Sequence, residues 1–241
     1  MSEIAANLGT MVLATGALGT AAFGVVDGLK TWRIGLSGYD QLRGTMGDSL
    51  FDALEKAYGA KTEEILQAQY RNGRKAGTLP KTLRRGVRIG LTTENAEKIG
   101  NELGTVDGRD LNSAAEMALS GALAAEEEDE KKKKEKERNR EVIARFELAA
   151  DARIDAALSL AEAKYKGLMR VYASITSIAF ALIAAFLINY EGTAAGAELK
   201  FDGLLYLQAL IVGIAAVPIA PVAKDIAKSL QSATKALKAT R

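Results

Sequence analysis

The side chains that most often perform chemistry in proteins are missing from this chain. Its 241 residues include no histidine and no cysteine. Without histidine the commonest general base and metal ligand is lost, and without cysteine there are no disulfides, thiolate metal sites or cysteine nucleophiles. No paired carboxylates, phosphate-binding glycine loop or nucleophile constellation replaces them. We therefore expect no enzyme, no metal site and no cofactor.

One acidic residue stands out by its position, because Asp27 closes a long uncharged stretch. In a ring of identical subunits, carboxylates at such a boundary select cations, which makes ions possible ligands. The alternative is a residue in the lipid headgroup layer, where Lys30, three positions further along, offers an ion-pair partner. Both interpretations remain open.

A second candidate is a run of cations with no acid between Glu64 and Glu94. Four of them share one helix face behind a proline: Lys81, Arg84, Arg85 and Arg88. Such a face binds anionic lipid headgroups or lines the vestibule of an ion path, and a plain solvated face is the alternative. Because no aromatic residues are interleaved, we expect no nucleic-acid partner.

The element that must carry Asp27 is the uncharged stretch of 23 residues from Ile4 to Val26. As a helix it is about 35 Å long, enough to cross a bilayer. Small residues at four-residue intervals predict a face that another helix can approach closely. The residues assigned to pore lining or helix packing are Gly9, Gly16, Thr20, Gly24, Asp27 and Gly28. A pore-lining helix among identical subunits and simple packing within one subunit are both open.

Two further uncharged stretches, Val171 to Tyr190 and Gly203 to Ala223, are also long enough to span a bilayer. Pro218 and Pro221 predict a kink near the end of the last one. The cations flanking all three stretches favour one side. By the positive-inside rule, the N-terminus faces outward and the C-terminus lies in the cytoplasm, at the inner (plasma) membrane.

Between these stretches the pattern is helical throughout. Residues 30–125 read as a glycine-rich joint or broken helix over 34–47, followed by short amphipathic helices, the last capped by Asp110. Residues 126–168 predict a long charged helix. Its apolar side recurs with an eleven-residue period, which indicates a coiled coil only in the broad sense of a nearly straight or slightly right-handed bundle rather than a heptad coil. That side consists of Ile143, Phe146, Ala150, Ile154, Ala157, Ala161, Tyr165, Leu168 and Tyr172.

The sequence therefore predicts an all-α membrane protein with three transmembrane helices and a helical cytoplasmic domain. The long charged helix is expected to run directly into the second transmembrane helix, and a single helix from about Asp110 into the membrane is left open. The predicted parts are 1–29 (first transmembrane helix), 30–125, 126–168, 169–223 (transmembrane hairpin) and 224–241 (amphipathic cytoplasmic tail). The favoured function is a homo-oligomeric channel or pore in the lipid bilayer. A non-conducting scaffold or sensor, whose helical rod binds a partner, is the alternative.

Overall fold

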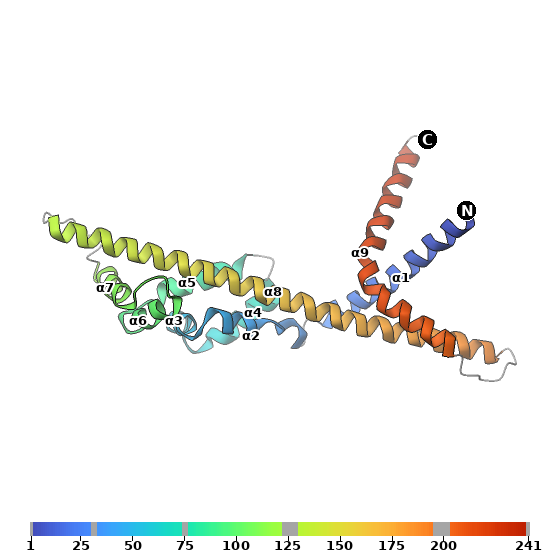
Figure 1. The fold of residues 1–241 in the computed structure, drawn as a ribbon, viewed down its shortest axis with the longest axis horizontal. Coiled ribbons are helices and arrows are strands. Elements are labelled where there is room, and N and C mark those ends of the chain that lie inside the picture. Colours follow the sequence, from blue (N-terminus) through green and yellow to red (C-terminus); the bar gives the residue numbers. More distant parts are fainter. Residues whose placement is uncertain (1, 30–32, 74–76, 122–129, 195–202, 240–241) are drawn as a thin grey trace. The chain divides into compact units, whose positions relative to one another are not determined.

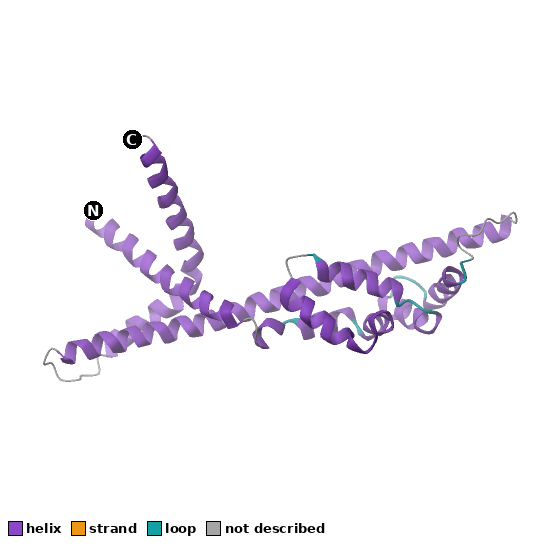
Figure 2. Cartoon of the chain, turned by 180° about the vertical axis from the view of Figure 1, so that it is seen from behind, coloured by secondary structure: helices purple, strands orange, loops and turns teal. Residues whose placement is uncertain are grey.

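The predicted helical class is confirmed. The computed structural model describes residues 2–29, 33–73, 77–121, 130–194 and 203–239, and every regular element in these ranges is a helix (Figures 1 and 2). The elements are α1 (Ser2–Gly28), η2 (Arg33–Leu36), α2 (Tyr39–Met46), α3 (Asp48–Tyr58), η3 (Gly59–Lys61), α4 (Thr62–Gly73), α5 (Thr78–Ile89), α6 (Thr93–Leu103), α7 (Gly108–Leu119), α8 (Glu130–Ala194) and α9 (Gly203–Ala239).

The chain divides into two units, which are described separately. The first, called here the apolar unit, comprises Met1–Ile34 and Lys166–Arg241. The second, called here the helical domain, comprises Gly35–Tyr165. The helix α8 contributes its first part to the helical domain and its last part to the apolar unit.

The helical domain forms around one apolar core. Each short helix presents apolar side chains at three- and four-residue spacing, and these side chains are buried. The largest fully buried ones are Leu42, Met46, Leu50, Leu54, Leu66, Tyr70, Leu79, Leu83, Ile99, Leu111, Phe146 and Ile154. The predicted joint over 34–47 takes the broken-helix form. It contains η2 and α2, separated by Gly38, whose positive φ permits the turn.

The ends of these helices follow local capping chemistry. Gly59 ends α3, and Thr92 caps α6 in a reciprocal box with Asn95. The prediction that Asp110 caps the next helix was wrong, because Asp107 accepts hydrogen bonds from the backbone amides of Arg109 and Asp110.

The apolar side of α8 is confirmed over most of its length. Phe146, Ala150, Ile154, Ala157 and Ala161 are all buried in the core of the helical domain, while the predicted Ile143, Tyr165 and Leu168 are only partly buried. The prediction fails at Tyr172, whose side chain is 42% exposed. Beyond Tyr165 the buried residues of α8 are Met169 and then four small residues of the apolar unit, Ala173, Ser177, Ala181 and Ala185.

One helix from about Asp110, which the sequence left open, is not what the structure shows. The helix α7 ends at Leu119, and Gly121 has a φ of +73°, a conformation that stops a helix. The next described residue is Glu130, where α8 begins, so the predicted start at 126 lies outside the described residues. From Glu130 to Ala194, however, charged and apolar segments form one uninterrupted helix.

The apolar unit contains the three stretches that the sequence singled out. By length and composition, three helices are long and apolar enough to cross a membrane, with candidate segments Met11–Gly28, a stretch within α8, and Gly203–Pro221. The helix α9 continues to Ala239, so the backbone of the predicted tail extends the same helix. Pro218 and Pro221 lie inside it, and Figure 1 shows α9 changing direction part-way along its length.

Candidate functional site

The first helix uses one side for packing within its own chain. Gly16, Gly19, Ala22 and Val26 are buried, and α1 packs along α9. A Cβ added to Gly19 would overlap the backbone carbonyl of Ala216, so the two helix backbones touch directly. This is the close approach that small residues permit between helices in lipid.

The predicted small-residue face of α1 is only partly on that side. Gly16 is buried, but Thr20, Gly24 and Gly28 are exposed. A Cβ added to Gly24 or Gly28 would have no heavy atom within 4 Å. The reason is geometric, because a four-residue step turns about 40° beyond a full revolution, so the row drifts away from Gly16. We call Thr20, Gly24 and Gly28 the open face of α1.

The remaining predicted residues of α1 are less informative. The hydroxyl of Thr20 donates to the carbonyl of Gly16 at 2.8 Å, so its own helix satisfies it. Asp27 is exposed in the last turn. Gly9 and the predicted partner Lys30 lie outside the residues whose surroundings are described.

The basic face of α5 does not act as one surface. Arg84 donates to both carboxylate oxygens of Asp155, at 2.6 and 2.7 Å, and lies 3.5 Å from Asp151. Arg88 lies 3.3 Å from Glu147 and 3.8 Å from Asp151. Two of the four predicted lipid-binding or vestibule cations are therefore paired with α8.

The other two cations, Lys81 and Arg85, are exposed on the outer side of α5. Neither has an ion-pair partner among the described residues. An anionic ligand on this helix would therefore meet these two side chains first, with Ile89 exposed one turn further along. The lipid or vestibule role of this face remains a prediction.

The acidic row on α8 and a buried tyrosine were not singled out from the sequence. Glu147, Asp151 and Asp155 recur every four residues, the same interval as Arg84 and Arg88, and this shared spacing was the available signal. The hydroxyl of Tyr70 lies 3.2 Å from the carbonyl oxygen of Ser37 and 3.3 Å from that of Ala161, far apart in the chain.

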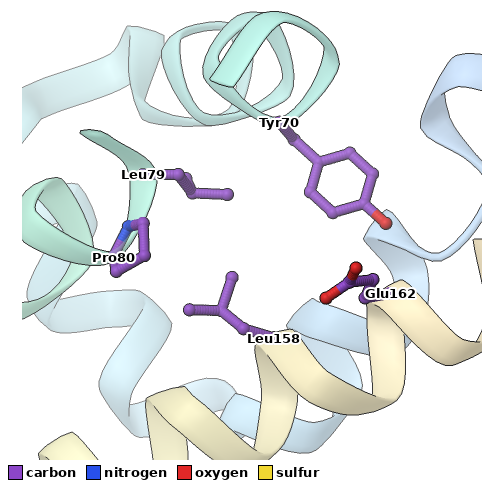
Figure 3. A pocket seen from close by; sticks show the side chains of 5 residues that line it. All are labelled: Tyr70, Leu79, Pro80, Leu158 and Glu162. Atoms are coloured by element: carbon purple, nitrogen blue, oxygen red, sulfur yellow. The ribbon is translucent and has the colours of Figure 1, made fainter. Parts of the chain in front are cut away.

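Beside Tyr70 lies a small cavity of about 70 Å³, lined also by Leu79, Pro80, Leu158 and Glu162 (Figure 3). Figure 3 shows the Tyr70 hydroxyl and the Glu162 carboxylate at one end and the three apolar side chains at the other. Its volume suits a few water molecules rather than an organic substrate.

Tyr39 contributes a second buried phenol to the helical domain. Its ring packs edge-on against that of Tyr70, with centroids 5.7 Å apart, and its hydroxyl has no hydrogen-bond partner among the described residues. Burial, followed by the negative charge of Glu63, raises the pKa of the Tyr39 phenol well above its ordinary value. The phenol therefore stays neutral far into the alkaline range.

Within the described ranges, no three acidic side chains come close enough together to hold a metal ion. Among the described residues, the structure brings together packed helices and ion pairs. In comparisons with known proteins, no family model, no curated protein and no solved structure matches the chain. Over the residues that the structure describes, the protein is all-helical, and three of its helices are long and apolar enough to cross a membrane.

Proposed function

We propose that the chain is an integral membrane protein whose three apolar helices cross the bilayer. On α8, large apolar side chains point away from the chain's own core. The exposed ones are Ile175, Ile183, Phe186, Leu187 and Ile188. On α9 the exposed large apolar side chains include Leu204, Leu207, Ile211 and Ile214. Such a density of exposed aliphatic surface suits lipid and is unfavourable in water.

Two exposed aromatic residues support this proposal. Tyr172 and Tyr190, 42% and 56% exposed, bracket the five exposed apolar side chains of α8 named above. Eighteen residues of helix separate them, which corresponds to about 27 Å, close to the thickness of the hydrocarbon core. Tyrosine favours the two membrane–water boundaries. We place Arg170 and the helical domain on the cytoplasmic side of the inner (plasma) membrane, with the N-terminus outside, because cations gather there.

Within the bilayer, we propose a homo-oligomer that forms a channel or pore. The observation that carries this proposal is the open face of α1, where Gly24 and Gly28 have empty space beside them. The opposite side of the same helix already packs against α9, which is its partner within the chain. A second small-residue face in lipid favours another helix, which we assign to a second copy of the chain. Asp27 would then form a ring of carboxylates at the inner mouth.

The competing function is a non-conducting scaffold or sensor. It is favoured by the continuity of α8, which links the helical domain to an apolar segment in a single element. A partner bound along the charged part of α8 would then act on the same helix. In neither case do we propose catalysis.

The first test is the mass of the purified protein in detergent, followed by ion flux in liposomes. We expect several chains per particle and a measurable flux. Gly24→Leu fills the open face and should reduce the particle to fewer chains, whereas the matched control Val25→Leu, at an exposed neighbouring position, should not. A wild-type particle of one chain would refute the oligomer. An intact oligomer that carries no ion flux would exclude the channel and support the scaffold or sensor function.

A further inference from the structure

The side of α8 that faces away from the core of the helical domain carries a second row of uncharged side chains. Its central positions are Ala152 and Ala163, both exposed. Because these two positions are eleven residues apart, they repeat at the period of the buried side and stay on one line along the helix. The exposed row, called here the outer stripe, consists of Leu148, Ala152, Ala156, Ser159, Leu160 and Ala163.

The outer stripe has the composition of a helix–helix seam. Leu148 and Leu160 are large apolar side chains, 72% and 49% exposed, and the positions between them are small. Single exposed apolar residues are ordinary on a protein surface, whereas a continuous row marks a contact surface. From Leu148 to Ala163 the helix rises by about 22 Å. Small residues along such a row allow two helix axes to approach to about 8–10 Å.

Charges of opposite sign border the outer stripe on its two sides. An acid directly precedes each central alanine and a cation directly follows it: Asp151 and Arg153 around Ala152, and Glu162 and Lys164 around Ala163. Because one residue turns the helix by about 100°, the acids lie on one flank and the cations on the other. Neither Arg153 nor Lys164 has an ion-pair partner among the described residues, and the Nε of Arg153 also lacks a hydrogen bond there.

We infer that the outer stripe packs against the outer stripe of a second copy of the chain, with the two α8 helices parallel and in register. A two-fold axis along such a pair places the cationic flank of each helix beside the acidic flank of the other. An antiparallel pair would place like charges together on both sides. In register, each cation stands two residues from an acid of the other helix, a rise of about 3 Å. Asp151 also contacts Arg84, and a carboxylate accepts further partners.

This inference rests on the proposed homo-oligomer and adds to it a contact outside the apolar unit. Copies that are inserted in one bilayer with the same topology hold their α8 helices parallel, which is the orientation that the flanking charges select. Assembly in the membrane also raises the local concentration of the outer stripes. A contact too weak to join separate chains can then form between neighbours.

The test uses disulfide formation between copies of the full-length protein in detergent. Because the chain has no cysteine, Ala152→Cys and Ala163→Cys each introduce a single thiol. A parallel pair in register brings each new thiol next to its own equivalent, within the Cα separation of about 4.4–6.8 Å that a disulfide needs. In an antiparallel pair, position 152 would face position 163 instead, so neither variant alone would cross-link.

The matched control is Ala60→Cys, at an exposed alanine of η3 in the same domain. After mild oxidation we expect each outer-stripe variant to give several-fold more covalent dimer than this control. The mass of the same particles separates the two proposals. Particles of several chains in which Ala152→Cys cross-links no more than Ala60→Cys would overturn the α8 contact and leave the oligomer. Particles of one chain would remove both.

A charge reversal tests the flanks in the Ala163→Cys background. Lys164→Glu makes both flanks acidic at this level and should lower the dimer yield several-fold. Adding Glu162→Lys exchanges the two charges, restores opposite signs across the pair and should recover the yield. Both side chains are exposed, so circular dichroism should show unchanged helix content. A yield that ignores Lys164→Glu, or that the exchange fails to recover, would contradict the inferred pairing.

Discussion

The backbone of Gly19 in α1 lies directly against the carbonyl oxygen of Ala216 in α9. A similar approach joins α9 to α8, where a Cβ added to Gly213 would lie 2.7 Å from the Cα of Ile178. The apolar unit is therefore built from contacts that admit no side chain at either glycine. Its packing energy comes from many close van der Waals contacts between backbones rather than from large interlocking residues.

The first prediction separates the two sides of α1. Gly19→Ala should lower the free energy of unfolding by about 1–3 kcal/mol, because the added methyl group forces α1 and α9 apart. Gly24→Ala, on the open face, should leave the free energy of unfolding of the single chain unchanged or raise it by up to about 1 kcal/mol, because no atom of the same chain lies within 4 Å and alanine favours a helix. Thermal unfolding of the solubilised protein measures both. Equal effects at the two positions would contradict the assignment of faces.

The second prediction concerns the proposed pore. Asp27→Asn should reduce the preference for cations over anions in liposome flux, because it removes the ring of negative charge at the inner mouth. The oligomer mass should stay unchanged. Asp48→Asn is a suitable control, since Asp48 lies in the first turn of α3 in the helical domain. Unchanged selectivity in an active Asp27→Asn channel would remove Asp27 from the ion path.

The third prediction uses the buried phenol of Tyr39. Tyr39→Phe should raise the free energy of unfolding by about 1 kcal/mol, because the hydroxyl is buried without a partner. The raised pKa also predicts alkaline destabilisation. Above the ordinary value of 10.0 the unfolded chain loses this proton while the folded chain retains it, so stability falls as pH rises. Tyr39→Phe should weaken this loss, as measured by unfolding at pH values on both sides of 10.0.

The fourth prediction tests how α8 is held. Phe146→Ala should destabilise the helical domain by about 3–5 kcal/mol, because Phe146 is the largest fully buried side chain that α8 contributes to the core. Leu148→Ala is the control on the same helix, and its side chain is 72% exposed. It should have a far smaller effect by chemical denaturation. A large effect of Leu148→Ala would show that another surface covers this side of α8.

The fold class could be predicted because it depends on local patterns. Helical spacing at Leu50 and Leu54, the stop at Gly59 and the uncharged length of 171–190 each carry their own information. The side of α1 that meets α9 could not be predicted. Gly16 belongs to two rows, one toward Gly19 and one toward Thr20, and only the partner helix decides between them.

The pairing of the α5 cations with α8 likewise could not be predicted from the residue pattern of one helix. Lys81, Arg84, Arg85 and Arg88 share similar local spacing, but only two of them face the acidic row of α8. Pairing at a separation of about seventy residues depends on how the domain folds. The matching four-residue intervals in the two segments are visible in the sequence, but no local pattern shows that the two segments pack together.

The prolines of α9 have a chemical consequence for a helix in hydrocarbon. Pro218 has no amide hydrogen for the carbonyl of Ile214, and Pro221 has none for that of Val217. Two oxygens one turn apart are thereby left to accept hydrogen bonds from outside the helix ladder. Where α9 crosses lipid, these oxygens attract water or a hydroxyl to that depth. Hydration of this span then reaches inward from its end at Pro221 as far as the carbonyl of Ile214.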